Sequence, residues 1–186
     1  MSTLDNPNQE LPNTPFWDTV LRYGLYCAGA YVVLSLLIYL TSFNMMTIGG
    51  MIVFYASIFA VGFVFAFMAM RHQRDRLDGG YITYGKALLV GLLTVFIGVF
   101  VSSFWNYVLI NFIDPNYAAN LKEQFVETWG ERMPADALEE ALEGFDKAGD
   151  LLTILKQGLI GGGIYGLIVG LITAAFMKKQ PEITMR

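Results

Sequence analysis

The sequence predicts an all-α fold: a four-helix transmembrane bundle with two short amphipathic helices between the third and fourth spans. The chain has 186 residues, of which 55% are hydrophobic and only 15% are charged, whereas a soluble domain carries about one charged residue in four. The segments 23–70, 87–113 and 157–177 contain no Asp, Glu, Lys or Arg. Since about 20 apolar residues cross the hydrocarbon core of a bilayer, these segments provide enough chain for four spans.

The first uncharged segment contains two of the four spans. Its 48 residues are too many for one crossing and sufficient for two with a tight turn. The turn is expected at 41–50, where polar residues and a Gly-Gly pair interrupt the apolar pattern. We therefore expect the first helix at 16–42 and the second at 50–70.

A basic loop and the third span follow, and they complete the part of the chain from 16 to 113. The loop, 71–86, reads RHQRDRLDGGYITYGK, and the span, 87–113, has 27 residues without a charge. Basic side chains at a membrane surface attract anionic lipid head groups, although they can equally serve only to set the orientation. The residues expected to contact lipid head groups are Arg71, Arg74, Arg76 and Lys86.

The last span, within 151–179, carries a row of small residues at every fourth position. Six glycines fall among its 21 uncharged residues. Each would cost about 1 kcal/mol in a soluble helix, but in a bilayer small residues allow a neighbouring helix to approach closely. The third span has a similar row, and we expect the two rows to face each other as a packing seam, with the lining of an oligomeric pore as the alternative. The seam residues are Gly158, Gly162, Gly166, Gly170 and Ala174 on the last span, and Thr94, Gly98, Ser102 and Asn106 on the third.

The segment 114–150 differs in composition from the spans. It contains ten acidic residues against three basic ones. Two stretches, 115–129 and 134–148, each begin at a proline and carry apolar residues along one face, which predicts two short amphipathic helices. The acids do not follow the alternate-position pattern of a calcium-binding loop, so no metal site is expected.

The distribution of lysine and arginine predicts the orientation. With four spans, both termini and the loop 71–86 share one side, which holds eight of the twelve basic residues. Because short basic loops are retained in the cytoplasm, we expect that side to be cytoplasmic. The chain would then have a disordered cytoplasmic tail at 1–15, a second cytoplasmic tail at 180–186, and an extracytoplasmic acidic segment at 114–150.

The spans lack the groups that intramembrane catalysis and proton transfer require. No Asp, Glu, Lys, Arg or His lies in the three uncharged segments. One cysteine, Cys27, and one histidine, His72, are too few for a thiol or histidine metal site. We therefore expect no catalytic residue, no cofactor and no enzymatic activity.

The residues from Phe54 to Asn116 resemble a known family. The stretch FYASIFAVGFVFAFMAMRHQRDRLDGGYITYGKALLVG, followed by FIDPNY and the acidic MPADALEEALE, is similar to bacterial membrane proteins of the domain of unknown function 4199 family. The likeness extends over about 14–179. It implies a four-span integral protein of the inner membrane, known chiefly from Bacteroidota, with a periplasmic acidic segment and no established activity.

These observations lead to an expectation about function. We expect a non-catalytic structural or interaction module of the bacterial inner membrane. The alternative is an oligomeric channel or carrier for a small neutral solute, lined by Thr94, Ser102 and Asn106. The expected partners are the lipid bilayer and proteins that meet the acidic segment or the basic loop. No nucleic acid partner is expected, and oligomerisation is left open.

Overall fold

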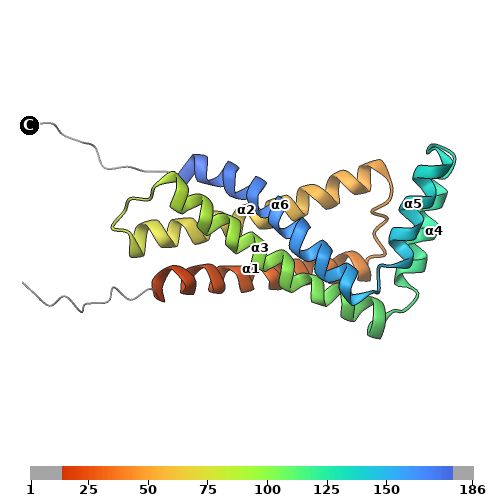
Figure 1. Ribbon diagram of the computed structural model, residues 1–186, viewed down its shortest axis with the longest axis horizontal. Helices are drawn as coiled ribbons and strands as arrows, with labels where there is room; N and C mark the ends of the chain where they lie inside the picture. Colours follow the sequence, from red (N-terminus) through yellow and green to blue (C-terminus); the bar gives the residue numbers. More distant parts are fainter. Residues whose placement is uncertain (1–13, 178–186) are drawn as a thin grey trace, which may run out of the picture.

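The computed structural model describes residues 14–177, which form six α-helices. Four of them are long and apolar enough to cross a membrane: α1 (Thr14–Leu40), α2 (Ile48–His72), α3 (Tyr84–Val108) and α6 (Leu151–Met177). The other two, α4 (Tyr117–Trp129) and α5 (Ala135–Asp146), lie across one end of the bundle (Figure 1). The predicted fold class is confirmed. Both expected tails fall on residues 1–13 and 178–186, outside the described part, apart from Thr14 and Pro15.

Helices α2 and α3 begin at capping side chains rather than at the edges of the uncharged segments. The hydroxyl oxygen of Thr47 accepts a hydrogen bond of 3.0 Å from the amide of Gly50, and Thr83 caps α3 in the same way through Lys86. Both helices therefore start two or three residues earlier than expected. The charge pattern marks what can lie in hydrocarbon, whereas the backbone hydrogen bonds that start a helix depend on its caps.

Both α2 and α3 end in a π-helical turn, at Gln73–Leu77 and Leu109–Ile113 respectively. After the first of these turns, Gly79 and Gly80 have φ values of 64° and 90°. This left-handed backbone suits glycine because it has no Cβ. The chain thereby reverses direction between α2 and α3, and the basic loop lies at the same end of the bundle as the start of α1 and the end of α6 (Figure 1). We call this the basic end, and the end that carries α4 and α5 the acidic end.

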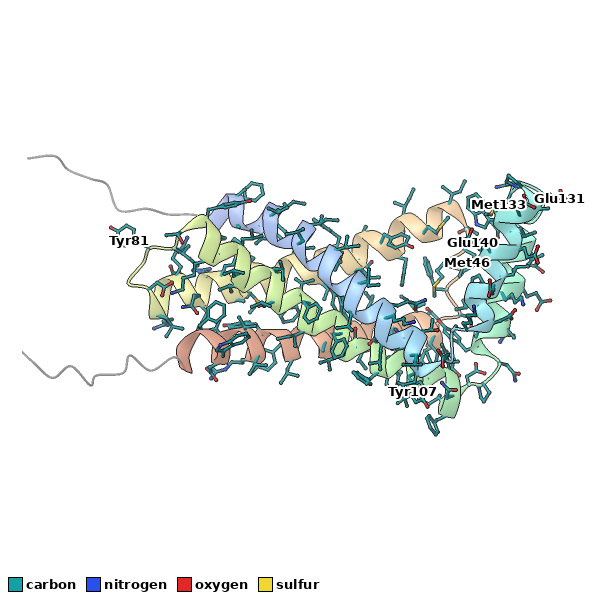
Figure 2. All side chains as sticks on the ribbon, in the orientation of Figure 1. Met46, Tyr81, Tyr107, Glu131, Met133 and Glu140 are labelled. Carbon is teal, nitrogen blue, oxygen red and sulfur yellow. The ribbon has the colours of Figure 1, made fainter. Side chains whose placement is uncertain are left out.

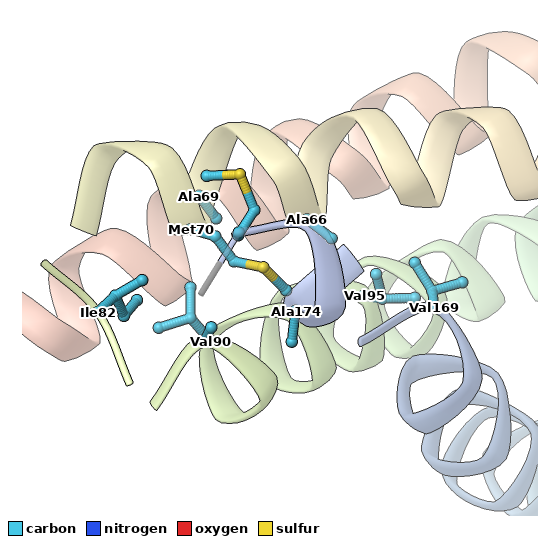
Figure 3. Close-up of a cluster of buried hydrophobic side chains, with 10 residues drawn as sticks. Ala66, Ala69, Met70, Ile82, Val90, Val95, Val169 and Ala174 are labelled. Atoms are coloured by element: carbon cyan, nitrogen blue, oxygen red, sulfur yellow. The ribbon is translucent and has the colours of Figure 1, made fainter. Parts of the chain in front are cut away.

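The tightest packing lies in the half of the bundle near the basic end. Side chains from the last turns of α2, the first turns of α3 and the last turns of α6 meet there in one buried cluster (Figure 3). Its small members allow the helices to approach closely, which is how helices associate in a bilayer. The labelled members are Ala66, Ala69, Met70, Ile82, Val90, Val95, Val169 and Ala174.

Helices α4 and α5 form a hairpin that is attached to the bundle. The rings of Phe125 and Phe145 lie 5.4 Å apart between the two helices. The indole of Trp129 donates a hydrogen bond of 2.9 Å to the carbonyl of Met46, in the loop between α1 and α2. Figure 2 shows Met46 beside this hairpin, which carries Glu131 and Glu140. The acidic segment thus folds into the two short helices that its apolar stripes predict.

Candidate functional site

The glycine row of α6 packs against the backbone of α3. A Cβ added to Gly166 would lie 2.7 Å from the carbonyl oxygen of Leu92. A Cβ added to Gly170 would lie 3.0 Å from the amide nitrogen of Leu92. Gly158 and Gly162 are buried in the same way, against Ser103 and Phe96 respectively. The row, with the buried Ala174 at its end, therefore makes room for α3 of the same chain.

The expectation that the two small-residue rows face each other is wrong for Thr94 and Gly98. A Cβ on Gly98 would meet Cys27 on α1, 2.7 Å from its Sγ atom, and not α6. Thr94 lies on this α1 side too, where its carbonyl oxygen approaches Gly24. The reason is geometric: residues two apart on a helix point about 200° apart, so Leu92 and Thr94 lie on opposite faces of α3. Gly166 and Gly170 of α6 therefore pack against the α3 backbone at Leu92, whereas Gly98 of α3 packs against Cys27 of α1.

The basic end holds the four residues expected at lipid head groups, and three of them are paired. Arg71 and Arg74 contact Asp75, and Lys86 contacts Asp78 at 2.6 Å. Arg76 is exposed and has no ion pair within residues 14–177. A shallow groove at this end is lined by Tyr23, Met68, Arg71, His72, Asp75 and Arg76. Contact with lipid head groups stays a prediction for all four residues, of which Arg71 and Arg76 line this groove.

The other half of the bundle contains a cavity of about 430 Å³, which we call the capped cavity. It lies between α1, α2, α3 and α6, beneath the α4–α5 hairpin. It contains the other two members of the α3 row, Ser102 and Asn106. The residues that line it are Tyr31, Leu34, Ser35, Ile38, Met45, Phe54, Ile58, Val99, Ser102, Ser103, Trp105, Asn106, Ile110, Tyr117, Leu121, Ala148, Ile154, Gln157 and Gly158.

Two tyrosines bond to the carbonyl of Ile58, which lines the capped cavity together with Tyr31, and we call this level the floor of the cavity. The hydroxyls of Tyr165 on α6 and Tyr31 on α1 both donate to the carbonyl of Ile58 on α2, at 2.9 Å and 3.4 Å. A Cβ on Gly62, one turn further along α2, would come within 2.9 Å of both hydroxyl oxygens. Glycine at this position therefore leaves room for both rings. The three helices are joined at this level, and α2 diverges from α1 and α3 beyond it (Figure 1).

The hairpin forms the roof of the cavity. Tyr117 and Leu121 of α4 line it, together with Ala148 just after α5. The ring of Tyr117 also packs edge-on against Tyr39 of α1, at 5.7 Å. At the other end of the hairpin, the side-chain amide of Asn111 donates to the carbonyl of Gly149 at 3.1 Å. Contacts from α1, from the loop before α2 and from the end of α3 thus hold the roof in place.

The polar groups of the capped cavity are uncharged. Ser102 and Ser103 donate to carbonyls of their own helix, and the indole of Trp105 donates to the hydroxyl of Ser35 at 3.3 Å. The side-chain amides of Asn106 and Gln157 make no hydrogen bond to any residue between 14 and 177. The cavity therefore has apolar walls and two amides that are free to bind a neutral polar group. Gln157 was missed by sequence reasoning, although it is the one amide among the uncharged residues of the last span.

Ion pairs and hydrogen bonds perturb the pKa values of three groups at the acidic end. Burial and the charge of Asp114 raise the pKa of Tyr117. The hydrogen bond to Glu143 raises the pKa of Lys147. Hydrogen bonds from the hydroxyl and amide of Thr153 lower the pKa of Asp150, which caps the start of α6. Each of these groups therefore keeps its usual charge at neutral pH. Among residues 14–177 no three His, Cys, Asp or Glu side chains are grouped to hold a metal ion.

Comparison with known proteins gives one match. A family model described as "Protein of unknown function (DUF4199)" matches residues 22–179. The match includes α1 from residue 22 onward, the other three long helices and the α4–α5 hairpin. No curated protein and no solved structure matches the chain.

Proposed function

Because this chain belongs to the DUF4199 family of proteins of unknown function, and carries four helices able to cross a membrane, we propose that it is a non-catalytic interaction module of the bacterial inner membrane. One observation carries this proposal: the acidic side chains stand exposed on a hairpin that is attached to the bundle. A fixed, charged surface suits binding to a partner of opposite charge.

The hairpin has more acidic side chains than its own bases neutralise. Lys122 binds Asp146 at 2.6 Å, and Lys147 binds Glu143. Six further acids of this segment are exposed and have no ion pair within the described residues: Glu123, Glu127, Glu131, Asp136, Glu139 and Glu140. A surface of one sign of charge raises the rate of encounter with a partner of the other sign. The partner that fits is a protein with a basic surface on the same side of the membrane.

The charge distribution supports a cytoplasmic location for the basic end. The segment 71–86 carries four basic residues, whereas the loop between α1 and α2 carries none. Positive residues in short loops are retained in the cytoplasm. Both termini would then be cytoplasmic, and the hairpin would face the periplasm.

The placement of reactive groups supports a role without catalysis. The four helices cross the bilayer with uncharged segments, and the described acids lie at or beyond the helix ends. The exposed acids of the hairpin lack the burial that retunes carboxylates for acid–base work. Cys27 is buried between α1 and α3, against Gly98. What the interior offers is hydroxyls, amides and aromatic rings, which pack and form hydrogen bonds.

The test is to neutralise the hairpin and follow its partner. Glu123, Glu127, Glu139 and Glu140 would be replaced together by Gln, with replacement by Asp as the matched control that keeps the charge. Proteins crosslinked to the periplasmic side and purified in mild detergent should be recovered with the native and Asp forms. They should be lost with the Gln form and at raised salt, because exposed charge pairs are screened. Equal recovery with all three forms would contradict the proposal.

A channel or carrier for a small neutral solute is the second candidate. The uncharged polar groups of the capped cavity, Ser102 and Asn106 among them, favour it. Purified protein in liposomes should then pass a neutral solute such as glycerol, and Ser102→Phe should block the flux. Flux equal to that of empty liposomes would reject this candidate and leave the first one standing.

A further inference from the structure

We propose that the capped cavity binds a neutral lipid with a single hydrocarbon chain and a hydroxyl-bearing head group, taken from the surrounding leaflet. This inference concerns a ligand site within the membrane, and it goes beyond the interaction role proposed for the hairpin. It depends on the walls of the cavity, its two amides and its position in the bundle.

The walls fit a hydrocarbon chain. The cavity of about 430 Å³ falls within the range of small-molecule sites, about 300–1,000 Å³. Each of the four long helices contributes large apolar side chains to it, among them Ile38, Phe54, Val99 and Ile154. Such walls offer dispersion contacts to a hydrocarbon chain.

The lining selects against charged lipids. It contains no Asp, Glu, Lys, Arg or His. A phosphate or carboxylate placed there would lose its hydration without gaining a counter-charge, at a cost of several kcal/mol. The bases at this end do not line the cavity, and two of them, Lys122 and Lys147, are paired with Asp146 and Glu143. The head group that fits the capped cavity is therefore uncharged.

The two free amides provide the hydrogen bonds for that head group. Gly158 contacts Ser103, where a Cβ would lie 2.8 Å from the hydroxyl oxygen. Gln157 lies one residue before Gly158 on α6, and Asn106 lies one turn after Ser103 on α3. Because α3 leads into the hairpin and α6 follows it, both amides lie on the hairpin side of this contact. Each amide can donate and accept hydrogen bonds, which matches a hydroxyl. The head would lie under the roof, and the chain would extend toward Ile58 at the floor.

The position of the cavity favours entry from the bilayer. Helix α2 is held at Ile58 by the two tyrosines, and the loop before it is held at Met46 by Trp129. Between these points it diverges from α1 and α3 (Figure 1). The hairpin covers the cavity on the aqueous side through Tyr117 and Leu121. A lipid would thus enter sideways, along the outer half of α2, rather than from water.

A photoreactive lipid tests the proposal on the whole protein. The probe is a monoacylglycerol with a diazirine near the end of its chain, in vesicles of phosphatidylethanolamine and phosphatidylglycerol. Mass spectrometry should place its adducts on floor residues such as Ile58. Unlabelled monoolein should compete, whereas oleate and additional phosphatidylglycerol should not. Adducts spread evenly over lipid-facing residues such as Ile52 would overturn the site, and equal competition by oleate would overturn the neutral head group.

Two variants and one control sharpen the result. The double replacement of Asn106 and Gln157 by Leu should lower labelling by at least about fivefold, because two hydrogen bonds are lost. Ser102→Phe fills the cavity and should abolish floor labelling. Ile52→Phe adds similar bulk to the exposed face of α2 and should leave labelling unchanged. Unchanged labelling in the Leu double variant would overturn the role of the amides. Recovery of the hairpin's partner reports on the interaction role separately.

Discussion

Tyr165 on α6 donates a hydrogen bond of 2.9 Å to the carbonyl of Ile58 on α2, 107 positions away in the sequence. This contact lies where the tightly packed half of the bundle meets the capped cavity. Tyr31 reaches the same carbonyl from α1. Together the two tyrosines fix the level at which α2 leaves its neighbours.

Removing these hydroxyls should loosen α2. Tyr165→Phe and Tyr31→Phe should each lower the free energy of unfolding by about 0.6 kcal/mol, the average for hydrogen bonds between helices in membranes. Thermal unfolding in detergent would measure the change. Tyr55→Phe is the control and should have no effect, because Tyr55 of α2 is 63% exposed. Equal stability of all three variants would show that the contact does not hold α2.

Adding volume to the glycine row should separate α6 from α3. Gly166→Leu should destabilise the protein by about 1–3 kcal/mol, the usual effect of overpacking, because a Cβ there lies 2.7 Å from a backbone oxygen of α3. Gly161 and Gly163 are the matched controls, since no atom lies within 4 Å of a Cβ added to either. Their replacement by Ala should leave thermal stability unchanged or raise it. Similar losses at all three positions would indicate a general effect of glycine replacement.

A disulfide should report which helix faces Gly98. In the variant Gly98→Cys, the new thiol lies beside Cys27 on α1 and should form a disulfide with it under mild oxidation. Intact mass after alkylation would show both thiols protected. Gly166→Cys is the control, and its thiol and that of Cys27 should both stay reactive. A further variant combines Gly98→Cys and Gly166→Cys with Cys27→Ser. A disulfide between the two new cysteines would show that the two rows face each other and would contradict this prediction.

Reporter fusions should test the orientation. Because the side with the basic loop carries eight of the twelve basic residues, fusions after Asp78 and Gln180 should read cytoplasmic. Fusions after Asn44 and Asp136 should read periplasmic. A cytoplasmic reading at Asp136 would reverse the proposed location of the hairpin.

Acidification should weaken the start of α6. Hydrogen bonds to Asp150 lower the pKa of its carboxyl below the ordinary value of 3.8. A group whose pKa is lower in the folded state stabilises above its ordinary pKa, and this stability is lost as the pH falls through the folded value. Asp150→Ala should therefore reduce thermal stability at neutral pH and reduce it less below pH 3.8. Glu139→Ala, which removes an unpaired exposed acid, should show no such pH-dependent difference.

Much of the architecture could be predicted from the sequence. The uncharged segments determine the number of spans, because a charge in hydrocarbon is costly and a chain crossing it must be helical. The prolines and apolar stripes of 114–150 determine the two short helices of the hairpin. These features depend on composition and on neighbours along the chain, so they can be read without knowing which helices meet.

The tertiary structure decided which faces meet and where space remains. The sequence shows small residues on α3 and on α6, but a shared period does not say which neighbour each face meets, and Gly98 packs on α1 rather than α6. The capped cavity could not be foreseen, since it depends on α2 being held at Ile58, and the loop before it at Met46, by residues distant in the sequence. Local pattern determines which segments become membrane helices. The complementarity of side-chain shapes, which exists only once the helices are assembled, determines their partners and the site between them.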